Sequence, residues 1–343
     1  MKRPCINASQ TSIIKMRELH PIPLKTFNFN WMKIKNKIFG YSKKVPALYF
    51  FLLIIKKYRV DLLTRIYSQK ELIIRTYKRG TGVNLNLKNP LRFTEKLQWL
   101  KLNYFSSAMN IYTDKVAVRK YIESKGYKYL LNEVIGIYSN PDEIKVEELP
   151  ERFVLKTSHS SGWNVICTDK DKLMKDWFWW KKILKLWLKE DYSKYYQETQ
   201  YKDIKPQLIC EKFLGSIKTG LNDYKFYCFN GKVKVIQTDI ERYTNHQQNF
   251  YDENWNFINV SAGVKNFNNH TQPKPKKSDE MIKISQHLSE DFLHVRVDFF
   301  EWNDKIYFAE LTFCDGAGYY KSEPADLDHK MGEYLILPKI QPS

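Results

Sequence analysis

The sequence predicts an α+β fold, in which a basic helical N-terminal segment precedes mixed helices and strands and then antiparallel β-hairpins. Charge marks the first segment: residues 1–60 contain thirteen Lys or Arg and one acid, Glu18, in a chain of net charge +18. Segments of helical and of strand type are mixed up to about residue 190, and short alternating strands dominate from Gln207 onward. This order does not fit the regular βαβ series of a parallel sheet.

The composition is that of a folded protein with reduced thiols. Hydrophobic residues make up 43% of the 343 residues and aromatic residues 15%, which excludes a disordered chain. The five cysteines are scattered and odd in number, which suits a cytoplasmic protein without disulfides. The seven histidines show no metal-ligand spacing, so we expect no zinc site.

The apolar run Val45–Ile55 is the main feature of the basic segment, and lysines flank it on both sides. Its eleven residues are too few to cross a bilayer, which takes about twenty. Two interpretations stay open. The run is either a buried core helix or an interfacial helix that its basic flanks hold on an anionic membrane.

The later elements follow from periodicity and turn residues. Asn230–Gly231 between alternating strands predicts a tight hairpin. The spacing of Trp177, Trp180, Leu184 and Trp187 predicts a helix that buries an aromatic stripe. Further helices are expected within Asn84–Asn103, over Asp114–Gly126, from about Leu173 to Glu190 and from Glu280 to Ser289, and a strand over Tyr129–Tyr138.

The loop between the expected strands Phe153–Leu155 and Val165–Cys167 is longer than a tight hairpin requires. It contains a lysine, hydroxyl side chains and a glycine, which are the groups that bind phosphate. Its spacing matches neither a P-loop nor a dinucleotide-binding motif. A phosphate loop and an ordinary surface hairpin both remain open.

The hairpin formed by His294–Phe300 and Ile306–Phe313 carries the clearest chemical signal. Burying its two apolar faces together sets Val297 opposite Leu311 and Phe299 opposite Ala309. That register places Asp298 beside Glu310 on the other face, which also carries Arg296. Two facing carboxylates repel, so the pair is kept if one is protonated, if a basic side chain such as Arg296 intervenes, or if a divalent cation such as Mg²⁺ bridges them.

At this point the sequence resembles a known family. From about Asn84 to Pro338 it is similar to the ATP-grasp ligases, and within them to the TupA-like, teichuronopeptide-biosynthesis branch of bacterial polysaccharide loci. The resemblance rests on seven segments in a fixed order: NPLRFTEKLQWLK, TDKVAVRKYI, FVLKTSHSSGWN, CEKFLG, NDYKFYCFNGK, RVDFFEWNDKIYFAELTF and MGEYLILP.

The resemblance implies an ATP-grasp fold, in which two α+β subdomains grip ATP. It divides the chain into a basic helical segment over 1–80, a part preceding the ATP-grasp region over 81–150, a lid subdomain with the phosphate loop over 151–220, and a catalytic core with the magnesium site over 221–343. The resemblance does not need residues 1–31, so translation from Met32 or an additional arm is compatible with it.

The resemblance also implies where the nucleotide binds. Lys115 and Lys156 match the two lysines that hold the ATP phosphates. The loop from Thr157 to Gly162 matches the loop that closes over the β- and γ-phosphates. Glu211 matches the acid that binds the ribose hydroxyls, and the Lys212 backbone is expected near the adenine. The loop residues concerned are Ser158, His159, Ser160, Ser161 and Gly162.

The expected metal ligands are Asp298, Glu310 and Thr312. Many family members have Asn where this chain has Thr312, and a hydroxyl is a poorer ligand than an amide oxygen. Asp315 is a further source of oxygen. The expected catalytic residues are Lys156, Lys225, which is placed to reach the transferring phosphate, and Arg296, which with Arg242 is a candidate for binding the acceptor carboxylate.

The implied activity is an ATP-dependent carboxylate–amine ligation through an acyl phosphate, with ATP and Mg²⁺ as cofactors. The expected substrates are a uronic acid of a surface polysaccharide such as capsule or O-antigen, or its sugar-nucleotide precursor, and an amino acid or other amine. The reverse pairing, a glycan amino sugar with an external carboxylate, is the second option. We expect a cytoplasmic enzyme, peripheral to the inner membrane through its basic N-terminus, and do not expect nucleic acid as a partner.

Three alternatives remain open. A glycosyltransferase would use a sugar nucleotide and an Asp-x-Asp-type pair after a strand, and binding of sugar nucleotide without ATP would favour it. A small-molecule kinase would release a phosphorylated product instead of phosphate. A non-catalytic adaptor on the same fold would lack the phosphate lysines or the acid pair, and both are present.

Overall fold

The computed structural model describes residues 42–216, 221–240, 246–262, 266 and 272–339. The chain divides into two compact units, Met1–Tyr49 and Phe50–Ser343. In the first unit the described residues, 42–49, include the start of helix α2 (Pro46–Ile66). Met32 and the rest of the basic arm up to residue 41 lie outside the described residues. The second unit contains both β-sheets of the described chain.

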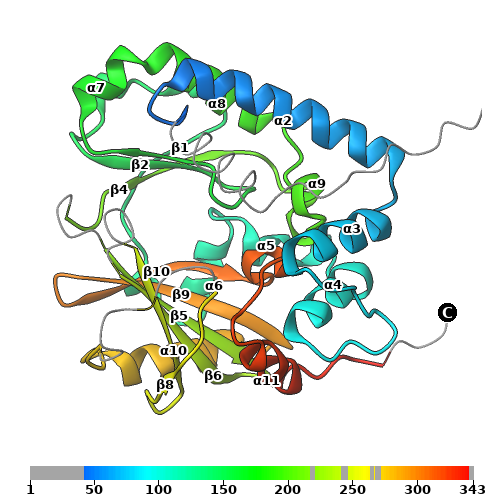
Figure 1. Ribbon diagram of the computed structural model, residues 1–343. Helices are drawn as coiled ribbons and strands as arrows, with labels where there is room; N and C mark the ends of the chain where they lie inside the picture. The colour runs from blue at the N-terminus through cyan, green and yellow to red at the C-terminus, as the bar shows by residue number, and fades with distance from the viewer. Residues whose placement is uncertain (1–41, 217–220, 241–245, 263–265, 267–271, 340–343) are drawn as a thin grey trace, which may run out of the picture. The chain divides into compact units, whose positions relative to one another are not determined.

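The smaller sheet has four antiparallel strands in the order β1-β4-β2-β3. They are β1 (Val134–Tyr138), β2 (Phe153–Thr157), β3 (Asn164–Cys167) and β4 (Leu208–Lys212). Helix α8 (Trp177–Leu188) contacts β2, and α7 (Lys170–Lys175) contacts α8 beside it (Figure 1). β1 lies within the expected part 81–150, so this sheet crosses the expected boundary at residue 150.

The larger sheet has six antiparallel strands in the order β10-β9-β5-β6-β7-β8. They are β5 (Asn222–Phe229), β6 (Lys232–Ile240), β7 (Gln247–Asp252), β8 (Phe257–Ile258), β9 (His294–Trp302) and β10 (Lys305–Thr312). Asn230 and Gly231 both have positive φ, as a type I′ turn requires, so the expected Asn-Gly hairpin is confirmed. The expected α+β class is confirmed as well.

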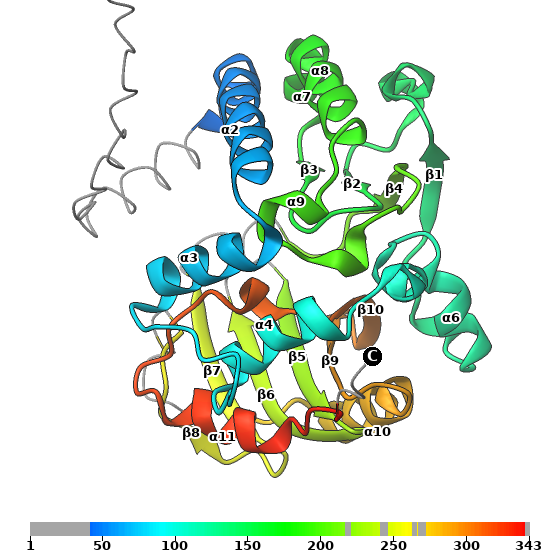
Figure 2. The ribbon, with the colours of Figure 1, turned by 90° about the vertical axis from the view of Figure 1, so that its right-hand side faces the viewer.

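The two faces of the larger sheet differ in polarity. One face carries Val295, Val297 and Phe299 and packs on helix α10 (Ser278–Ser289). The other face carries the polar side chains of β9 and is covered at one end by helix α4 (Phe93–Asn103). Figure 2 shows α10 and α4 on opposite sides of this sheet.

Helices α4 and α11 (Asp326–Tyr334) pack together, and hydrogen bonds near their ends join them. Both carboxylate oxygens of Asp328 accept hydrogen bonds from Thr94, one from its backbone N–H and one from its hydroxyl, each at 2.9 Å. Lys96 Nζ donates to the carbonyl oxygens of Gly332 and Leu335 at 2.7 Å, which satisfies the C-terminal end of α11. These bonds fix α11 against α4, the helix that covers one end of the polar face of the larger sheet.

Several boundaries differ from expectation, and the strand expected over Tyr129–Tyr138 is confirmed only over Val134–Tyr138. The expected helix Asp114–Gly126 is the shorter α6 (Val118–Ser124), although Asp114 does accept hydrogen bonds from the residues that precede this helix. The expected helix Leu173–Glu190 is two helices that meet at Asp176, and α10 begins two residues before Glu280. The others are α3 (Gln69–Thr81), α5 (Asn110–Thr113), α9 (Ser193–Tyr196) and the 3-10 turns η1 (Ser107–Met109), η2 (Lys128–Leu130), η3 (Pro141–Glu143), η4 (Val146–Glu148), η5 (Thr199–Tyr201) and η6 (Asp315–Gly318).

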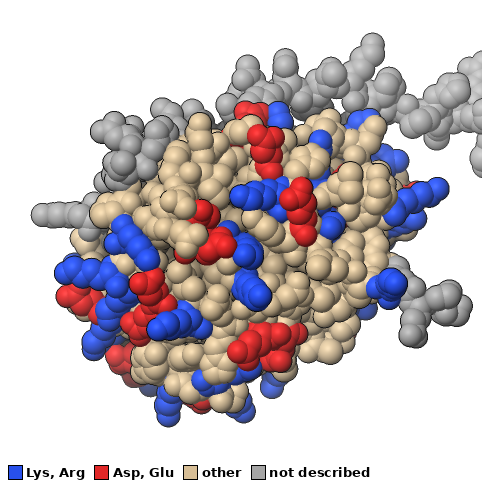
Figure 3. Space-filling model, turned by 90° about the horizontal axis from the view of Figure 1, so that it is seen from below, with Lys and Arg blue, Asp and Glu red and all other residues tan. Residues whose placement is uncertain are grey.

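The cysteines, the helix lengths and the surface charge complete the description of the fold. Four of the five cysteines are described, and these are buried and free: Cys167, Cys210, Cys228 and Cys314. None of the described helices has both the length and the apolar character that a bilayer span requires. On the face seen in Figure 3 the acidic and basic side chains are interspersed.

Replacing Gly332 by Ala should destabilise the protein by about 1–3 kcal/mol. An added Cβ would lie 2.0 Å from the Leu91 carbonyl oxygen and 2.9 Å from the Phe93 nitrogen, so α11 must move away from α4. In an unobstructed helix the same change would instead stabilise, because Ala has the higher helix propensity. Urea unfolding measures the effect, with Lys330→Ala on the exposed side of α11 as control. An unchanged or raised stability would contradict this packing.

His294→Phe should reduce the loss of stability on acidification. His294 is buried between the Phe93 and Phe229 rings, and burial lowers its pKa to about 4 from 6.5. Below pH 6.5 the unfolded chain therefore binds a proton that the folded chain does not, and this costs up to about 3 kcal/mol by pH 4. The free energy of unfolding of wild type relative to the variant should fall over that range. A pH-independent difference would contradict the prediction, and His329→Phe at an exposed site is the control.

Candidate active site

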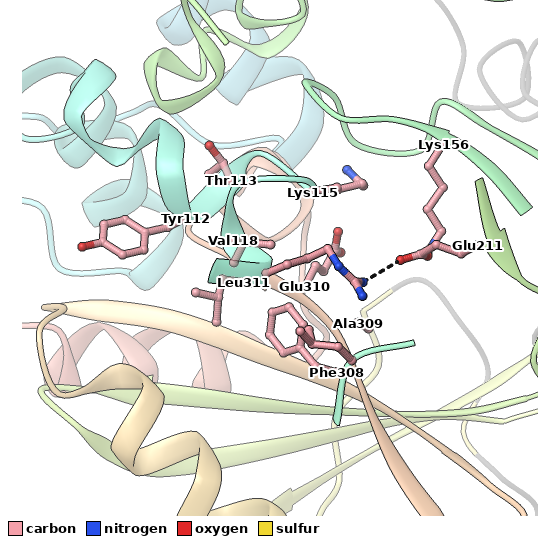
Figure 4. A pocket seen from close by; sticks show the side chains of 12 residues that line it. Tyr112, Thr113, Lys115, Val118, Lys156, Glu211, Phe308, Ala309, Glu310 and Leu311 are labelled. Atoms are coloured by element: carbon pink, nitrogen blue, oxygen red, sulfur yellow. Dashed lines mark hydrogen bonds and ion pairs between the residues drawn. The ribbon is translucent and has the colours of Figure 1, made fainter. Parts of the chain in front are cut away.

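A cleft between the smaller sheet and strand β10 brings together side chains from both sheets and from the segment between α5 and α6 (Figure 4). Lys115, Lys156, Glu211 and Glu310 all point into it. The complete lining is Tyr112, Thr113, Lys115, Val118, Arg119, Leu131, Lys156, Glu211, Phe308, Ala309, Glu310 and Leu311. Four of the residues expected at the nucleotide and metal sites therefore share one cleft.

Lys115 is fixed to the expected phosphate loop at two points. Its backbone N–H donates to the Ser158 carbonyl oxygen at 3.1 Å, and its Nζ donates to the Ser160 carbonyl oxygen. Burial lowers the pKa of Lys115, while the nearby Glu310 carboxylate opposes this shift. The lysine thus connects the loop of the smaller sheet with the acid of the larger one.

The side chains of Ser158, His159 and Ser160 are buried and bound within the protein. Ser158 Oγ accepts a hydrogen bond from the Gln207 N–H, and the Ser160 hydroxyl bonds to the Thr157 hydroxyl. Ser161 and Gly162 are exposed, and Gly162 has φ +75°. Among the described hydrogen bonds of this loop, none uses the backbone N–H groups of Ser160, Ser161 or Gly162. Any role of the loop in phosphate binding therefore falls to its backbone and to its exposed tip.

Aromatic packing against helix α8 holds the loop in place. The Trp163 ring stacks on Trp187 of α8, with centroids 5.8 Å apart and planes 10° from parallel. His159 Nε2 lies 3.0 Å from the Trp187 carbonyl oxygen, and burial lowers the pKa of His159 to about 4. The expected buried aromatic stripe of this helix is confirmed for Trp187 and Leu184. His159 is therefore a neutral structural residue in this arrangement.

Glu211 on β4 is held between two cations. Its Oε2 lies 2.5 Å from Lys156 Nζ on the neighbouring strand β2, and its Oε1 lies 3.4 Å from Arg119 Nη1. At Lys212 both backbone groups have partners: its N–H donates to the Glu133 carbonyl oxygen, and its carbonyl oxygen accepts from the Asn132 side chain. Nucleotide roles for these two residues remain predictions.

The expected register of the β9–β10 hairpin is confirmed at its centre. Val297 faces Leu311, and Asp298 faces Glu310. The expected pairing of Phe299 with Ala309 is wrong, because a β-bulge at Ala309 brings Phe308 opposite Phe299. A bulge adds one residue to one strand and increases the local twist, so it re-aims the side chains beside it.

Arg296 lies among the expected metal ligands. Its Nε and Nη2 donate to the two oxygens of Asp298 at 2.7 and 2.6 Å, and its Nη1 forms an ion pair with Asp315. The Glu310 carboxylate is 3.9 Å away from Nη2, and the Thr312 hydroxyl donates to Glu310 at 3.4 Å. The ion-pair network left open by the sequence is thus present.

The donor set nevertheless matches the chemistry of Mg²⁺. This ion binds oxygen, commonly through one or two carboxylates that are completed by water and substrate phosphates. Asp298 and Glu310 supply two facing carboxylates, and Glu310 is partly exposed in the cleft. Burial raises the pKa of Asp298 to about 6 although Arg296 beside it favours the ionised form. Within the described ranges no cluster of three His, Cys, Asp or Glu side chains is arranged to hold a metal.

The polar face of the sheet extends beyond the expected residues. Lys225 on β5 is buried, and its Nζ bridges Asp223 at 2.9 Å and Asp239 of β6 at 2.8 Å. Asp239 also accepts from His246 Nε2 at 2.6 Å and from Gln248 Nε2 at 3.0 Å. Burial alone would lower the pKa of Lys225, but the surrounding carboxylates raise it.

Sequence reasoning missed Asp239, His246, Gln248 and Arg119. A signal for Asp239 exists in KVKVIQTDI, where Gln237 and Asp239 follow Val235 at alternate positions and therefore share one face of the strand. Arg119 appears in the sequence as an ordinary exposed helix position. Arg242 lies outside the described residues, so the structure does not describe its side chain.

Lys225→Met should destabilise the protein by about 3–5 kcal/mol, because it leaves Asp223 and Asp239 buried without their shared cation. Adding Asp239→Asn should recover part of that loss, which a double-mutant cycle on urea unfolding would measure. The control is Lys234→Met on β6, whose pair with Glu253 is half-exposed and should cost about 1 kcal/mol or less. Equal losses at both lysines would contradict the proposed charge bridge.

Comparison with known proteins supports one family. A model of the TupA-like ATP-grasp family matches residues 95–336. Among solved structures, D-alanine–D-alanine ligase from Bacillus anthracis is 16% identical over 59% of this chain and 57% of its own, with TM-score 0.35. The corresponding ligase from Helicobacter pylori is 14% identical over 66% and 62%, with TM-score 0.36. ATP-grasp ligase PsnB, in complex with a variant precursor, Mg and ADP, is 10% identical over 64% and 56%, with TM-score 0.33.

Each of these matches covers less than two thirds of the other chain. The comparison with curated proteins gave no match. The family match and the two antiparallel sheets confirm the expected ATP-grasp fold. The matched region spans more than half of the chain and includes both expected phosphate lysines and both expected metal carboxylates. The chain therefore belongs to the TupA-like family of ATP-grasp ligases.

Proposed function

We propose that this ATP-grasp ligase joins a carboxylate to an amine with hydrolysis of ATP to ADP and phosphate. The observation that carries the proposal is the meeting of Lys115 and Lys156 with Glu310 in one cleft, with the facing carboxylate Asp298 on the adjacent strand. Cations suited to phosphate and acids suited to a divalent cation converge there from two sheets. Such an arrangement favours phosphoryl transfer, in which catalysis consists of positioning and charge stabilisation.

The proposed roles follow the position of each side chain. Lys115 and Lys156 bind the ATP phosphates, together with the backbone N–H groups at the tip of the loop, Ser161–Gly162. Lys156 then exchanges its present partner, Glu211, for phosphate oxygens, which leaves Glu211 able to accept hydrogen bonds from the ribose hydroxyls. Lys225, paired across strands with Asp298, is the cation on the far side of the reacting phosphoryl group.

Asp298 and Glu310 would hold Mg²⁺, with the Thr312 hydroxyl as a weaker third oxygen. When bound, the ion neutralises charge on the β- and γ-phosphates. The buried Asp298 ionises readily only with a cation beside it, and Arg296 supplies one in this structure.

The reaction balances in two steps. A carboxylate oxygen of the acceptor attacks the γ-phosphorus, the bond to the β-phosphate oxygen breaks, and ADP leaves with that electron pair. The amine nitrogen then attacks the carbonyl carbon of the acyl phosphate, phosphate leaves, and the nitrogen loses a proton to form the amide. Arg296 has the planar fork that matches a carboxylate, and it would bind the acceptor by exchanging one of its present partners, Asp298 or Asp315, for the acceptor carboxylate.

We propose a uronic acid of a surface polysaccharide, or its nucleotide- or lipid-linked precursor, as the carboxylate, and an amino acid or other amine as the nucleophile. The family resemblance to polysaccharide loci supports this assignment. The basic N-terminal sequence supports an acidic acceptor at the inner membrane face, because opposite charge raises the local concentration of such a substrate.

Thermal unfolding with Mg-ATP, with ATP plus chelator and with UDP-glucuronate tests the nucleotide site. A ligand at about a hundred times its Kd should stabilise by about 2.7 kcal/mol. We expect a Mg²⁺-dependent ATP shift in wild type that is lost in Glu310→Gln and retained in the control Glu333→Gln, which makes the same change on exposed α11. Phosphate release should then require a uronic acid and an amine together.

Two outcomes would contradict the proposal. A shift with UDP-glucuronate but none with ATP would favour glycosyl transfer. A phosphorylated sugar with no amide, formed without any amine, would favour a small-molecule kinase.

A further inference from the structure

The outward face of helix α2 is apolar, which is the reverse of the usual arrangement. Its exposed large side chains follow one another at spacings of three and four residues. At about 100° per residue they fall within an arc of about 80°. We call these residues the α2 stripe: Phe51 (55% exposed), Ile55 (63%), Tyr58 (69%), Leu62 (57%) and Ile66 (59%).

Basic residues border the α2 stripe on both sides. Arg59 and Arg65 are exposed, and their positions in the helix place one at each edge of the arc. The one acid of α2, Asp61, is only partly exposed, and its charge is paired with Lys57 at 2.9 Å. The exposed part of α2 within residues 50–66 therefore combines apolar groups with positive charge alone.

An aromatic cluster extends this surface onto α8. The Phe51 ring lies 6.0 Å from Trp179, and Trp179 lies 5.3 Å from Phe178, which is 60% exposed. Lys182 Nζ lies 4.4 Å above the Phe178 ring. Figure 1 shows α2 and α8 beside each other on the same side of the smaller sheet. The face seen from below in Figure 3, by contrast, mixes both signs of charge.

We infer that the α2 stripe, with Phe178 and Lys182, is a docking surface for an anionic lipid membrane. An interfacial helix lies in the membrane plane with its apolar face among the acyl chains and its cations at the headgroups. The α2 stripe supplies the apolar face, and Arg59, Arg65 and Lys182 supply the cations. Clusters of basic residues beside such a helix are typical of binding to anionic lipids.

Charge argues against two other partners for the α2 stripe, a second copy of this chain and the chain's own residues 1–41. A second copy of this chain would bring the same arginines against each other. Residues 1–41 contain eight Lys or Arg and one acid, so this segment would also meet the α2 stripe with like charge. The inference does not depend on the proposed reaction, since it concerns a surface on the other side of the smaller sheet from the cleft.

Vesicle flotation of the full-length protein tests the inference. We expect binding to phosphatidylcholine vesicles that contain phosphatidylglycerol and little binding to phosphatidylcholine alone. Ile55→Glu with Leu62→Glu should weaken the binding at least tenfold, and Arg59→Glu with Arg65→Glu should weaken it on the anionic vesicles. Ile336→Glu, the same change at a 68% exposed site away from α2, is the matched control.

A labelled variant locates the contact, because the basic arm alone could attach the protein to anionic vesicles. An environment-sensitive dye on Ile55→Cys should shift to shorter wavelength when such vesicles are added, and the dye on Ile336→Cys should not. Unchanged flotation of the double glutamate variant or an unresponsive dye at residue 55 would overturn the inference. So would a wild-type dimer in solution that the glutamate variant loses without any change in vesicle binding.

Discussion

The structure depends on the alternation of cations and carboxylates over one buried face of the larger sheet. Arg296 lies between Asp298 and Asp315, and Lys225 lies between Asp223 and Asp239. An isolated charge in such a position would cost several kcal/mol, whereas a fully paired network can be retained. Because the partners come from different strands, the pairing also penalises any slip in register: a shift by one residue would move these charges to the opposite face, onto α10.

The same constraint explains how one sheet serves both stability and chemistry. Along β9 the polar face begins with His294 beneath Phe93 of α4, continues with Arg296 and reaches Asp298. Helices α4 and α11 shield the first part from water, and the strand partner of Asp298, Glu310, lines the cleft. The opposite face of the same strand, with Val295, Val297 and Phe299, supplies the core. The Thr94–Asp328 and Lys96–Gly332 bonds therefore support the site from a distance, because they hold α4 and α11 in place.

The sequence allowed the centre of this arrangement to be predicted. The Val297–Leu311 register follows from alternation alone, and the Asn230–Gly231 turn follows from the need for positive φ. The bulge at Ala309 could not be predicted in the same way, because alternation assumes one residue opposite one residue. Nor could the burial of Ser158 and His159 be predicted, because their partners Gln207 and Trp187 lie far along the chain. A loop rich in hydroxyl groups has the same composition whether those groups face a ligand or the protein.

The charges that line the cleft indicate that a nucleotide would bind there together with a divalent cation. Among the lining residues, Lys115, Lys156 and Arg119 face two acids, Glu211 and Glu310, so the protein surface is close to balance before ligand binds. The phosphates of ATP would compete with Glu211 for Lys156 and would repel Glu310. A divalent cation held by Glu310 would convert that repulsion into attraction, and the Lys156–Glu211 pair is only partly buried, so it could open to the phosphates. If Mg²⁺ binds at Asp298 and Glu310 as proposed, the Thr312 hydroxyl, a weaker ligand than an amide oxygen, would leave a larger share of the coordination to the nucleotide. In this chain, therefore, metal and nucleotide should bind together far better than either does alone.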